Sequence, residues 1–429
     1  MAESFHFEHS VDFSHESAAE ALRAIPALPG VFALHGPPPA AGQQTAEPYL
    51  TRAADLRRRI TRILAPPDSQ SKRLNLRDRV ARIDYTITGS EFESTFTLYH
   101  ATVNIFSQTE ARRRLRLHTP FFLRFTAENA YPRVYSTNRL SRRALAHSYG
   151  PFPSRAAADR YCDAVLDLFM LRRCHEDLAP YPEHPGCVYG EMNKCLAPCN
   201  QACTPQGAAA YAAEAAAVES FFDTHGESHL AQLTAQREQA SAELDFERAA
   251  QLHAQFLRVK AAASLADPLV QPIPNLRAVI LQKTAKPSSR LDEPSCALFL
   301  VDGGLLAGPA LLAPAAVLTP ADAPDSAVTP TQRPEDLAGD ILGDLAARAQ
   351  LHSRSSPDLA TLSDHLSLLR RWYYRPEKQR TGEVFLPKDD GAWPIRRILN
   401  AAARISLGEA KPAPEAQLQQ PATPTEEVH

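Results

Sequence analysis

Apolar residues at the start of the chain follow the pattern of a small αβ unit. A short helix is expected over residues 18–24, and two brief apolar runs follow at residues 31–34 and 48–50. The Pro/Gly-rich segment PPPAAGQQ separates these runs, which predicts a β-hairpin with a long loop. A second helix is expected over residues 53–64, ending before two prolines.

Helical periodicity dominates the middle of the chain. Over residues 154–174, apolar positions three and four apart predict one long helix. Residues 208–265 also follow a helical pattern, with breaks at Gly226 and near residues 244–246. Asp245 is expected to cap the last helix, so the part after Gly226 predicts a helical hairpin. An isolated hairpin buries too little apolar surface to be stable, which favours a docking role.

The remaining pattern predicts an α+β multidomain fold. The last third is expected to contain strands over 276–281 and 296–301, a turn at Gly303 and Gly304, a Pro/Ala-rich connection over 313–334, and helices over 334–351 and 357–374. The predicted domains are a small αβ domain (1–102), a linker and cysteine region (103–205), a helical region (206–265, hairpin about 228–263), a C-terminal α/β domain (266–408) and a disordered tail (409–429).

Composition and charge add one feature to this picture, a local excess of basic residues near the N-terminus. No run of about 18 apolar residues and no basic-then-apolar leader is present, so we expect a cytoplasmic protein without a membrane contact. The net charge of -3 argues against a nucleic-acid binder, but residues 52–82 hold ten Arg or Lys against three acids. A second group follows at residues 112–116. Such guanidinium groups suit DNA phosphates, and a solvated helix face is the alternative. The candidate DNA contacts are Arg57, Arg58 and Arg62.

Five of the seven cysteines crowd into thirty residues, which indicates metal or cluster ligation rather than disulfides. Twelve, seven and three residues separate Cys174, Cys187, Cys195 and Cys199. Structural zinc sites usually bring ligands in two close pairs, whereas an iron–sulfur cubane tolerates uneven spacing. Zinc and unligated thiols remain alternatives, and Cys203 is left without a role.

The sequence around these cysteines resembles the UvrC family of the ABC excinuclease. The segments FMLRRC and CVYGEMNKCLAPC are similar to the family's cysteine region, and YGPFPS to the stretch that leads into it. The resemblance implies a [4Fe-4S] cluster held by Cys174, Cys187, Cys195 and Cys199.

A second resemblance lies near the N-terminus, where LPGVFAL and PYLTRAADLRRRI are similar to the GIY-YIG nuclease domain of that family. It implies that Tyr49 orients or deprotonates a water, while Arg52 and Arg59 neutralise the phosphate during metal-assisted phosphodiester hydrolysis. Phe32 replaces the tyrosine of the first motif, and Thr51 replaces a glycine of the second.

The metal ligand of that nuclease is the larger departure. The family's glutamate, which holds Mg²⁺ or Mn²⁺, aligns with Leu98, and a leucine cannot ligate a hard cation. Glu91 or Glu93 takes its place only in a shifted register. The alternatives are therefore a GIY-YIG-like fold kept for DNA binding and a nuclease that is impaired or rewired.

The third resemblance is to the UVR motif, through which the family binds the excinuclease protein UvrB. The small alanines allow close helix approach, and an exposed phenylalanine offers an apolar anchor. An ordinary surface hairpin is the alternative. The matching residues are Leu244, Phe246, Glu247, Ala249 and Ala250.

The resemblance covers about residues 20–265. The signatures of the family's C-terminal RNase H-like nuclease and helix-hairpin-helix motifs are not found, which leaves residues 266–408 without a role. In this region LRRWYYRPEK mixes aromatic and basic residues, and helix packing is favoured over a nucleic-acid contact. We expect a nucleotide-excision repair factor that binds double-stranded DNA with lesions and UvrB, and makes at most one incision. A non-catalytic adaptor and a redox sensor are the alternatives.

Overall fold

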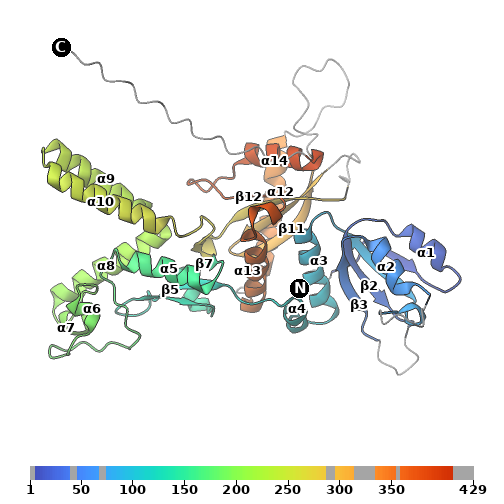
Figure 1. The fold of residues 1–429 in the computed structure, drawn as a ribbon, viewed down its shortest axis with the longest axis horizontal. Coiled ribbons are helices and arrows are strands. Elements are labelled where there is room, and N and C mark those ends of the chain that lie inside the picture. Colours follow the sequence, from blue (N-terminus) through green and yellow to red (C-terminus); the bar gives the residue numbers. More distant parts are fainter. Residues whose placement is uncertain are drawn as a thin grey trace, which may run out of the picture.

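A computed structural model describes residues 5–38, 46–66, 74–286, 295–313, 334–353 and 358–408. Three antiparallel sheets follow one another along the long axis of the molecule (Figure 1). The N-terminal domain lies at one end, the middle domain with its helical hairpin lies at the other, and the C-terminal domain lies between them. The predicted α+β class is confirmed. None of the described helices is long and apolar enough to cross a membrane.

The N-terminal domain is a four-stranded sheet, order β1-β4-β2-β3, with two helices against one face. Asp55 caps the second helix by accepting from the amide of Arg58, so this helix begins three residues later than predicted. A Cβ atom on Gly30 would lie 2.4 Å from the carbonyl oxygen of Thr86, which explains the glycine of the LPGVF segment. The elements are β1 (His9–Asp12), α1 (Ala18–Ala24), β2 (Gly30–His35), β3 (Tyr49–Ala53), α2 (Leu56–Leu64) and β4 (Arg82–Ile87).

Two helices connect this domain to the rest of the chain. Helix α3 (Glu91–Ile105) runs across the boundary expected after residue 102, and α4 (Gln108–Leu115) follows it. Phe92 and Phe96 of α3 share a core with Phe299 and Trp372 of the C-terminal domain. The N-terminal domain is therefore joined to the C-terminal domain by an apolar core.

The middle domain is built on a sheet of order β6-β5-β7-β8, whose last strand comes from beyond the hairpin. The long helix predicted over residues 154–174 is wrong in its second half, because α5 ends at Leu166. The following residues form a turn and then an irregular segment that enters the core, where the amide of Arg172 donates to the hydroxyl of Tyr211. The elements are β5 (Phe121–Phe125), β6 (Val134–Thr137), β7 (Ser148–Phe152), α5 (Arg155–Leu166), α6 (Val188–Glu191), α7 (Pro198–Gln201) and β8 (Gln271–Pro272).

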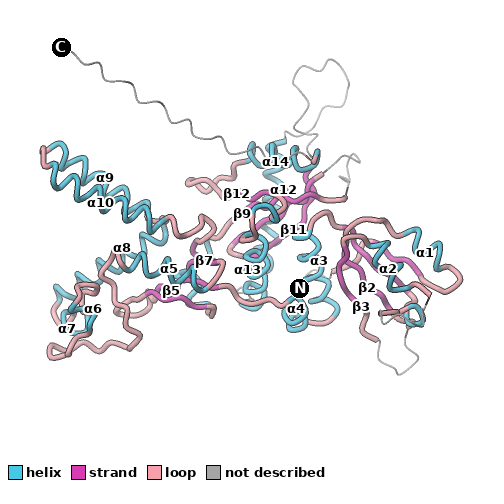
Figure 2. Tube along the Cα trace, in the orientation of Figure 1, coloured by secondary structure: helices cyan, strands magenta, loops and turns pink. Residues whose placement is uncertain are grey.

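Three helices, α8 (Pro205–Asp223), α9 (Glu227–Ala242) and α10 (Phe246–Ala263), occupy the predicted helical region. The breaks fall where the sequence predicts them, with Gly226 and Leu244 both in the left-handed region at φ 83° and 60°. Asp245 caps α10 by accepting from the amide of Arg248 at 3.0 Å. The helical hairpin of α9 and α10 is therefore confirmed, and Figure 2 shows it projecting from the molecule.

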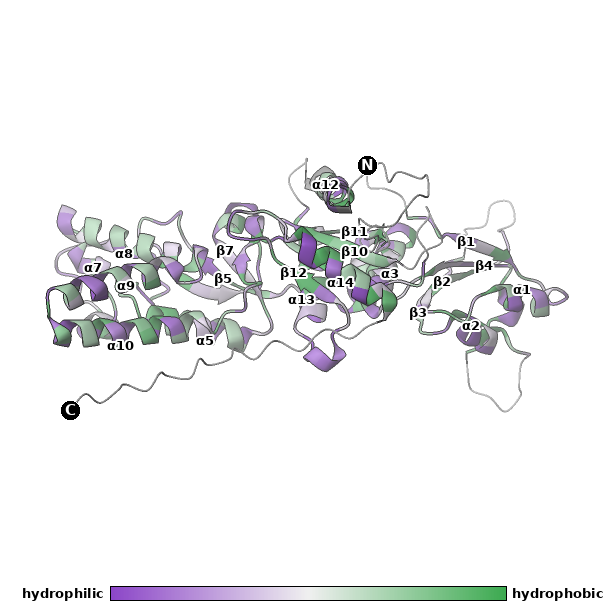
Figure 3. Cartoon of the chain, turned by 90° about the horizontal axis from the view of Figure 1, so that it is seen from above, coloured by the Kyte–Doolittle hydropathy of each residue, from purple (hydrophilic) through white to green (hydrophobic). Residues whose placement is uncertain are grey.

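The C-terminal domain is a sheet of order β11-β10-β9-β12 covered on both faces. Alternate residues of the central strands face α12 and α14 on one side and α13 on the other, and Figure 3 shows the hydrophobic sheet between α12 and α13. The predicted strands, the glycine turn and two helices are present, whereas β11, β12 and α14 were not predicted. The elements are β9 (Ala278–Lys283), β10 (Cys296–Asp302), β11 (Leu305–Leu312), α12 (Pro334–Ser353), α13 (Leu359–Tyr373), β12 (Glu383–Phe385) and α14 (Ile395–Leu407). Most of the predicted Pro/Ala-rich connection and the tail lie outside the described residues.

Candidate functional site

Strand β3 and helix α2 bring together two of the three residues predicted for nuclease chemistry. The Arg59 guanidinium donates to the Tyr49 hydroxyl over 3.4 Å. Phe32 lies beside Tyr49, with ring centroids 6.2 Å apart, and is fully buried in the domain core. Phe32 therefore packs against the Tyr49 ring from the domain core and offers no hydroxyl of its own.

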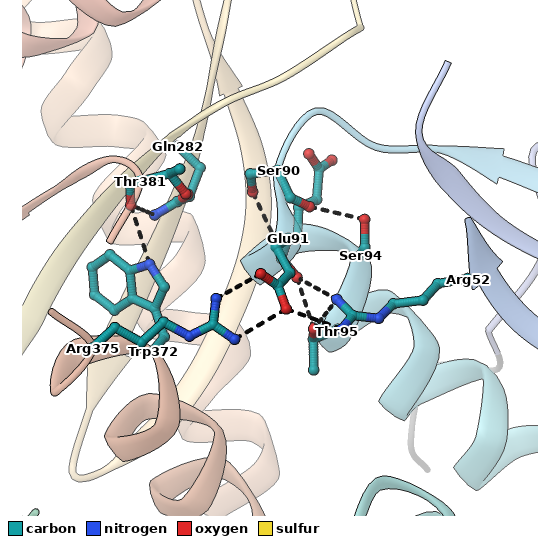
Figure 4. A network of polar contacts seen from close by, with 10 residues as sticks. Arg52, Ser90, Glu91, Ser94, Thr95, Gln282, Trp372, Arg375 and Thr381 are labelled. Atoms are coloured by element: carbon teal, nitrogen blue, oxygen red, sulfur yellow. Dashed lines mark hydrogen bonds and ion pairs between the residues drawn. The ribbon is translucent and has the colours of Figure 1, made fainter. Parts of the chain in front are cut away.

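Arg52, the third predicted residue, points away from this pair toward α3. Its guanidinium lies 3.0 Å from the Glu91 carboxylate and donates to the Thr95 hydroxyl over 2.9 Å. On the other side of Glu91, the Arg375 guanidinium makes a bidentate contact of 2.6 and 3.0 Å (Figure 4). The Arg375 hydrogen bond, followed by that of Arg52, lowers the pKa of Glu91 to about 2.

These residues do not fit a Mg²⁺ or Mn²⁺ site. Leu98, where the resemblance places the metal-binding glutamate, is a half-buried side chain of α3. Both oxygens of Glu91 are engaged by guanidinium groups. Glu93 is fully buried and accepts a hydrogen bond from the amide of Gly89, and burial raises its pKa to about 7. Neither acid that a shifted register offers is therefore available to a cation.

The three arginines of α2 predicted to contact DNA differ in their hydrogen bonds. The Arg57 side chain donates to the carbonyl oxygens of Ile25 and Arg23 at 2.6 and 3.2 Å, which ties α2 to the end of α1. Arg58 and Arg62 lie one turn apart on the helix and are exposed. All three predicted DNA contacts are exposed, and Arg57 differs from the other two because its guanidinium donates to backbone carbonyl oxygens.

The four predicted cysteine ligands lie in the segment between α5 and α8, with Cys199 in the short helix α7 and the other three outside the helices. Cys195 and Cys199 are buried, Cys174 and Cys187 are half-buried, and the extra Cys203 is exposed. Burial, together with the charges of Cys187, Cys174 and Cys199, raises the pKa of the Cys195 thiol to about 11, while the hydrogen bond from the Ala197 amide lowers it. The four thiols therefore lie within electrostatic reach of one another.

Hydrogen bonds to sulfur support two of these cysteines. The amide of Ala197 donates to Cys195 Sγ at 3.3 Å, and the Arg172 guanidinium donates to Cys174 Sγ at 3.4 Å. Donors of this kind stabilise sulfur that carries negative charge in iron–sulfur sites. Among the described residues, no three Cys, His, Asp or Glu side chains gather closely enough to hold a single metal ion.

The tip of the α9–α10 hairpin carries the predicted partner contacts. Leu244 is 72% exposed and Phe246 68% exposed, although both side chains are large and apolar. Glu247 and Ala250 are also exposed, and Ala249 is half-buried against α9. A leucine with φ of 60° is strained as well as exposed, so this turn holds both an unfavourable backbone conformation and an apolar side chain in solvent.

The aromatic and basic segment at the end of α13 packs against the other domains, as predicted. Arg370 and Tyr374 donate to the carbonyl oxygens of Pro153 and Pro151 in the middle domain. Arg371 donates to the carbonyl oxygens at the end of α4, and Arg375 binds Glu91. Sequence reasoning noticed this segment and missed the pairing of Arg375 with Glu91, because nothing local to either residue indicates the other.

Comparison with known proteins identifies two segments of the chain. The family model for the UvrC/Cho excinuclease middle domain matches residues 121–221, and the model for the UvrB/uvrC motif matches residues 227–262. The chain is 25% identical over 248 residues to the UvrABC system protein C of Idiomarina loihiensis, and 28% identical over 239 residues to that of Edwardsiella ictaluri. This chain belongs to the UvrC family.

The alignments show which parts carry the UvrC relationship. Each of the two relatives matches 56% of this chain, while the chain spans only 37% of the length of either relative. The middle-domain match includes all four predicted cysteine ligands, and the motif match includes the whole hairpin tip. No solved structure matches this UvrC-family chain.

Proposed function

We propose that this chain is a nucleotide-excision repair factor that docks on UvrB through the hairpin tip and contacts damaged duplex DNA through its N-terminal domain. The observation that carries the proposal is the pair of exposed apolar side chains, Leu244 and Phe246, at the tip of a hairpin matched by the UvrB/uvrC motif model. Burying two such side chains in a partner contributes about 1.5 to 3 kcal/mol each. Glu247 beside them adds a charge that selects the partner.

The docking proposal is tested by measuring the affinity for UvrB by calorimetry. Phe246→Ala is expected to weaken binding by ten-fold or more, because a central aromatic anchor is lost. The matched control is Leu257→Ala, which removes another exposed apolar side chain of α10, eleven residues from Phe246. Equal affinity of wild type and Phe246→Ala would rule out docking through the tip.

The proposed cofactor is a [4Fe-4S] cluster held by Cys174, Cys187, Cys195 and Cys199. The mutual electrostatic influence of the thiols and the donors to two of their sulfurs support this assignment. When bound, the cluster would cross-link loops that contain only two four-residue helices. The chain's own residues supply burial and hydrogen bonds to the ligands.

Anaerobic reconstitution tests the cluster. We expect about four iron atoms per chain with broad visible absorption. Cys195→Ser is expected to abolish both, whereas Cys203→Ser and Cys162→Ser are the matched controls that retain them. A stoichiometric zinc content without iron would replace the cluster with a structural zinc site.

The N-terminal domain is proposed to bind DNA without cutting it. Arg52 is engaged by Glu91, and Leu98 stands in place of the expected metal ligand. The contact between Tyr49 and Arg59 favours the rival function, a nuclease that makes one incision. Nicking of a damaged duplex with UvrB and Mg²⁺ or Mn²⁺ decides between them. No cut is expected, and a cut that Tyr49→Phe and Arg59→Ala abolish would establish the nuclease.

A further inference from the structure

The junction between the N-terminal and C-terminal domains gathers more positive than negative charge. Arg52 of β3 and Arg375, just after α13, both bind Glu91. Arg371 lines the same small cavity as Glu91 and Arg375. Burial lowers the pKa of Arg371, and Arg370, Arg375 and Arg52 lower it further by charge repulsion. One carboxylate therefore holds a group of guanidiniums that repel one another.

This basic group continues onto helix α4. Arg371 donates to the carbonyl oxygen of Arg116 at 2.7 Å, and Arg116 is itself exposed. Arg114 lies 3.3 Å from Glu47, just before β3, so α4 reaches the N-terminal domain. We define the junction track as Arg52, Arg375, Arg371, Arg116 and Arg114.

The way in which Glu91 is held matches the way in which proteins hold phosphate. Arg375 grips the carboxylate with two donors, and Arg52 adds a third from the opposite side (Figure 4). Parallel guanidinium donors suit phosphate as well as carboxylate. Glu91 also stands in the first turn of the fifteen-residue helix α3, where the helix dipole favours any anion. Its side chain is 46% exposed, so a ligand can reach it from solvent.

We propose that the junction track binds the phosphate backbone of DNA, and that Glu91 occupies this site as an internal phosphate mimic. The cavity beside Glu91 measures about 20 Å³, room for one water at most, so a phosphate must displace the carboxylate. DNA bound here contacts both domains at once. The inference rests on the proposed function, because it names the surface through which that function meets DNA.

The test measures the affinity of the full chain for a fluorescein-labelled duplex by anisotropy, without UvrB, over a series of salt concentrations. Glu91→Gln keeps the acceptor oxygen that holds the two arginines and removes the competing charge. It is expected to tighten DNA binding several-fold. Glu335→Gln, in the exposed first turn of α12, makes the same change in net charge away from the track and is the matched control.

The second arm removes cations from the track. Arg375→Gln is expected to weaken binding and to reduce the slope of log affinity against log salt by about 1, the signature of one lost phosphate contact. Arg375→Lys keeps the charge without the bidentate geometry, so its affinity for DNA is expected to lie between those of the wild type and Arg375→Gln. Thermal unfolding of each variant verifies that the junction still folds.

The outcomes separate this inference from the function on which it rests. If Glu91→Gln binds DNA no more tightly than Glu335→Gln, the Glu91 contacts are a structural ion pair and the phosphate site is wrong. If the wild-type chain itself does not bind the duplex, the DNA-binding part of the proposed function fails with it. Docking on UvrB, tested at Phe246, is independent of either result.

Discussion

The buried carboxyl group of Glu93 lowers the stability of the folded chain when it ionises. Its side chain is fully buried at the start of α3, and one carboxylate oxygen has no hydrogen-bond partner. Burial raises its pKa from 4.5 to about 7, while Lys286 lowers the pKa and Glu8 raises it. Between those values the folded chain holds a proton that the unfolded chain releases, so stability falls as pH rises.

Glu93→Gln is expected to remove the fall in unfolding free energy that the titration of Glu93 causes as the pH rises. The wild type should lose about 3 kcal/mol of unfolding free energy between pH 4.5 and 7, since each pKa unit corresponds to about 1.4 kcal/mol. The advantage of the glutamine should be almost absent at pH 4.5, grow progressively as the pH rises toward 7, and be complete above pH 7. Denaturant unfolding at the two pH values measures the difference. An equal gain at both would indicate a packing effect instead of titration.

Residues next to one another in sequence were predictable, and residues paired through space were not. The cap at Asp245 follows from local sequence, because an aspartate directly before an apolar helical pattern is a typical N-cap. The sequence predicted that Arg52 would neutralise a phosphate, whereas in the fold it binds Glu91. Arg375, the other arginine that binds Glu91, lies more than three hundred residues from Arg52 along the chain. Only the folded chain reveals that Glu91 lies between them.

At the scale of elements, periodicity predicted the helices that pack through one face and failed where packing overrides it. The break at Leu244 was predicted, and α8 to α10 follow the expected pattern. The helix expected through residue 174 stops at Leu166, and Phe169 and Leu171 are buried in the core outside any helix. Strand β12 has only three residues, too few to carry an alternating pattern.

The hairpin turn yields a prediction in which stability and binding move in opposite directions. Leu244→Gly should relieve the left-handed strain and stabilise the hairpin by about 1 kcal/mol, measured by hydrogen exchange of α9 and α10. The same change should weaken binding to UvrB several-fold, because the exposed leucine is lost. Leu244→Ala removes the side chain and keeps the strain, so it should weaken binding without the gain. Unchanged binding by both variants would show that the turn is only structural.

The order of the domains in space differs from their order along the chain. The C-terminal domain lies between the other two (Figure 1), and the end of α13 contacts both of them. Trp372 of this helix packs against Phe92 of α3 and donates to the carbonyl oxygen of Thr381. The two terminal parts of the chain should therefore unfold together.

Trp372→Ala is expected to separate them. Loss of this buried ring costs about 3 to 5 kcal/mol and empties the core shared with α3. Calorimetry should then show the N-terminal domain melting apart from the rest. Trp393→Ala is the matched control, because that ring packs on the opposite face of the sheet, against α14. A single transition in both variants would contradict the shared core.

The strand β8 has a consequence for how such a protein can change. The chain leaves the middle sheet before the hairpin and returns to it at β8, which pairs with Tyr149 and Gly150 of β7. The helical hairpin is thus inserted between two strands of the same sheet, and both of its ends connect to that sheet. The length and tip of the hairpin can diverge while the sheet beneath stays the same, so the surface proposed to dock on UvrB can evolve independently of the surface proposed to bind DNA.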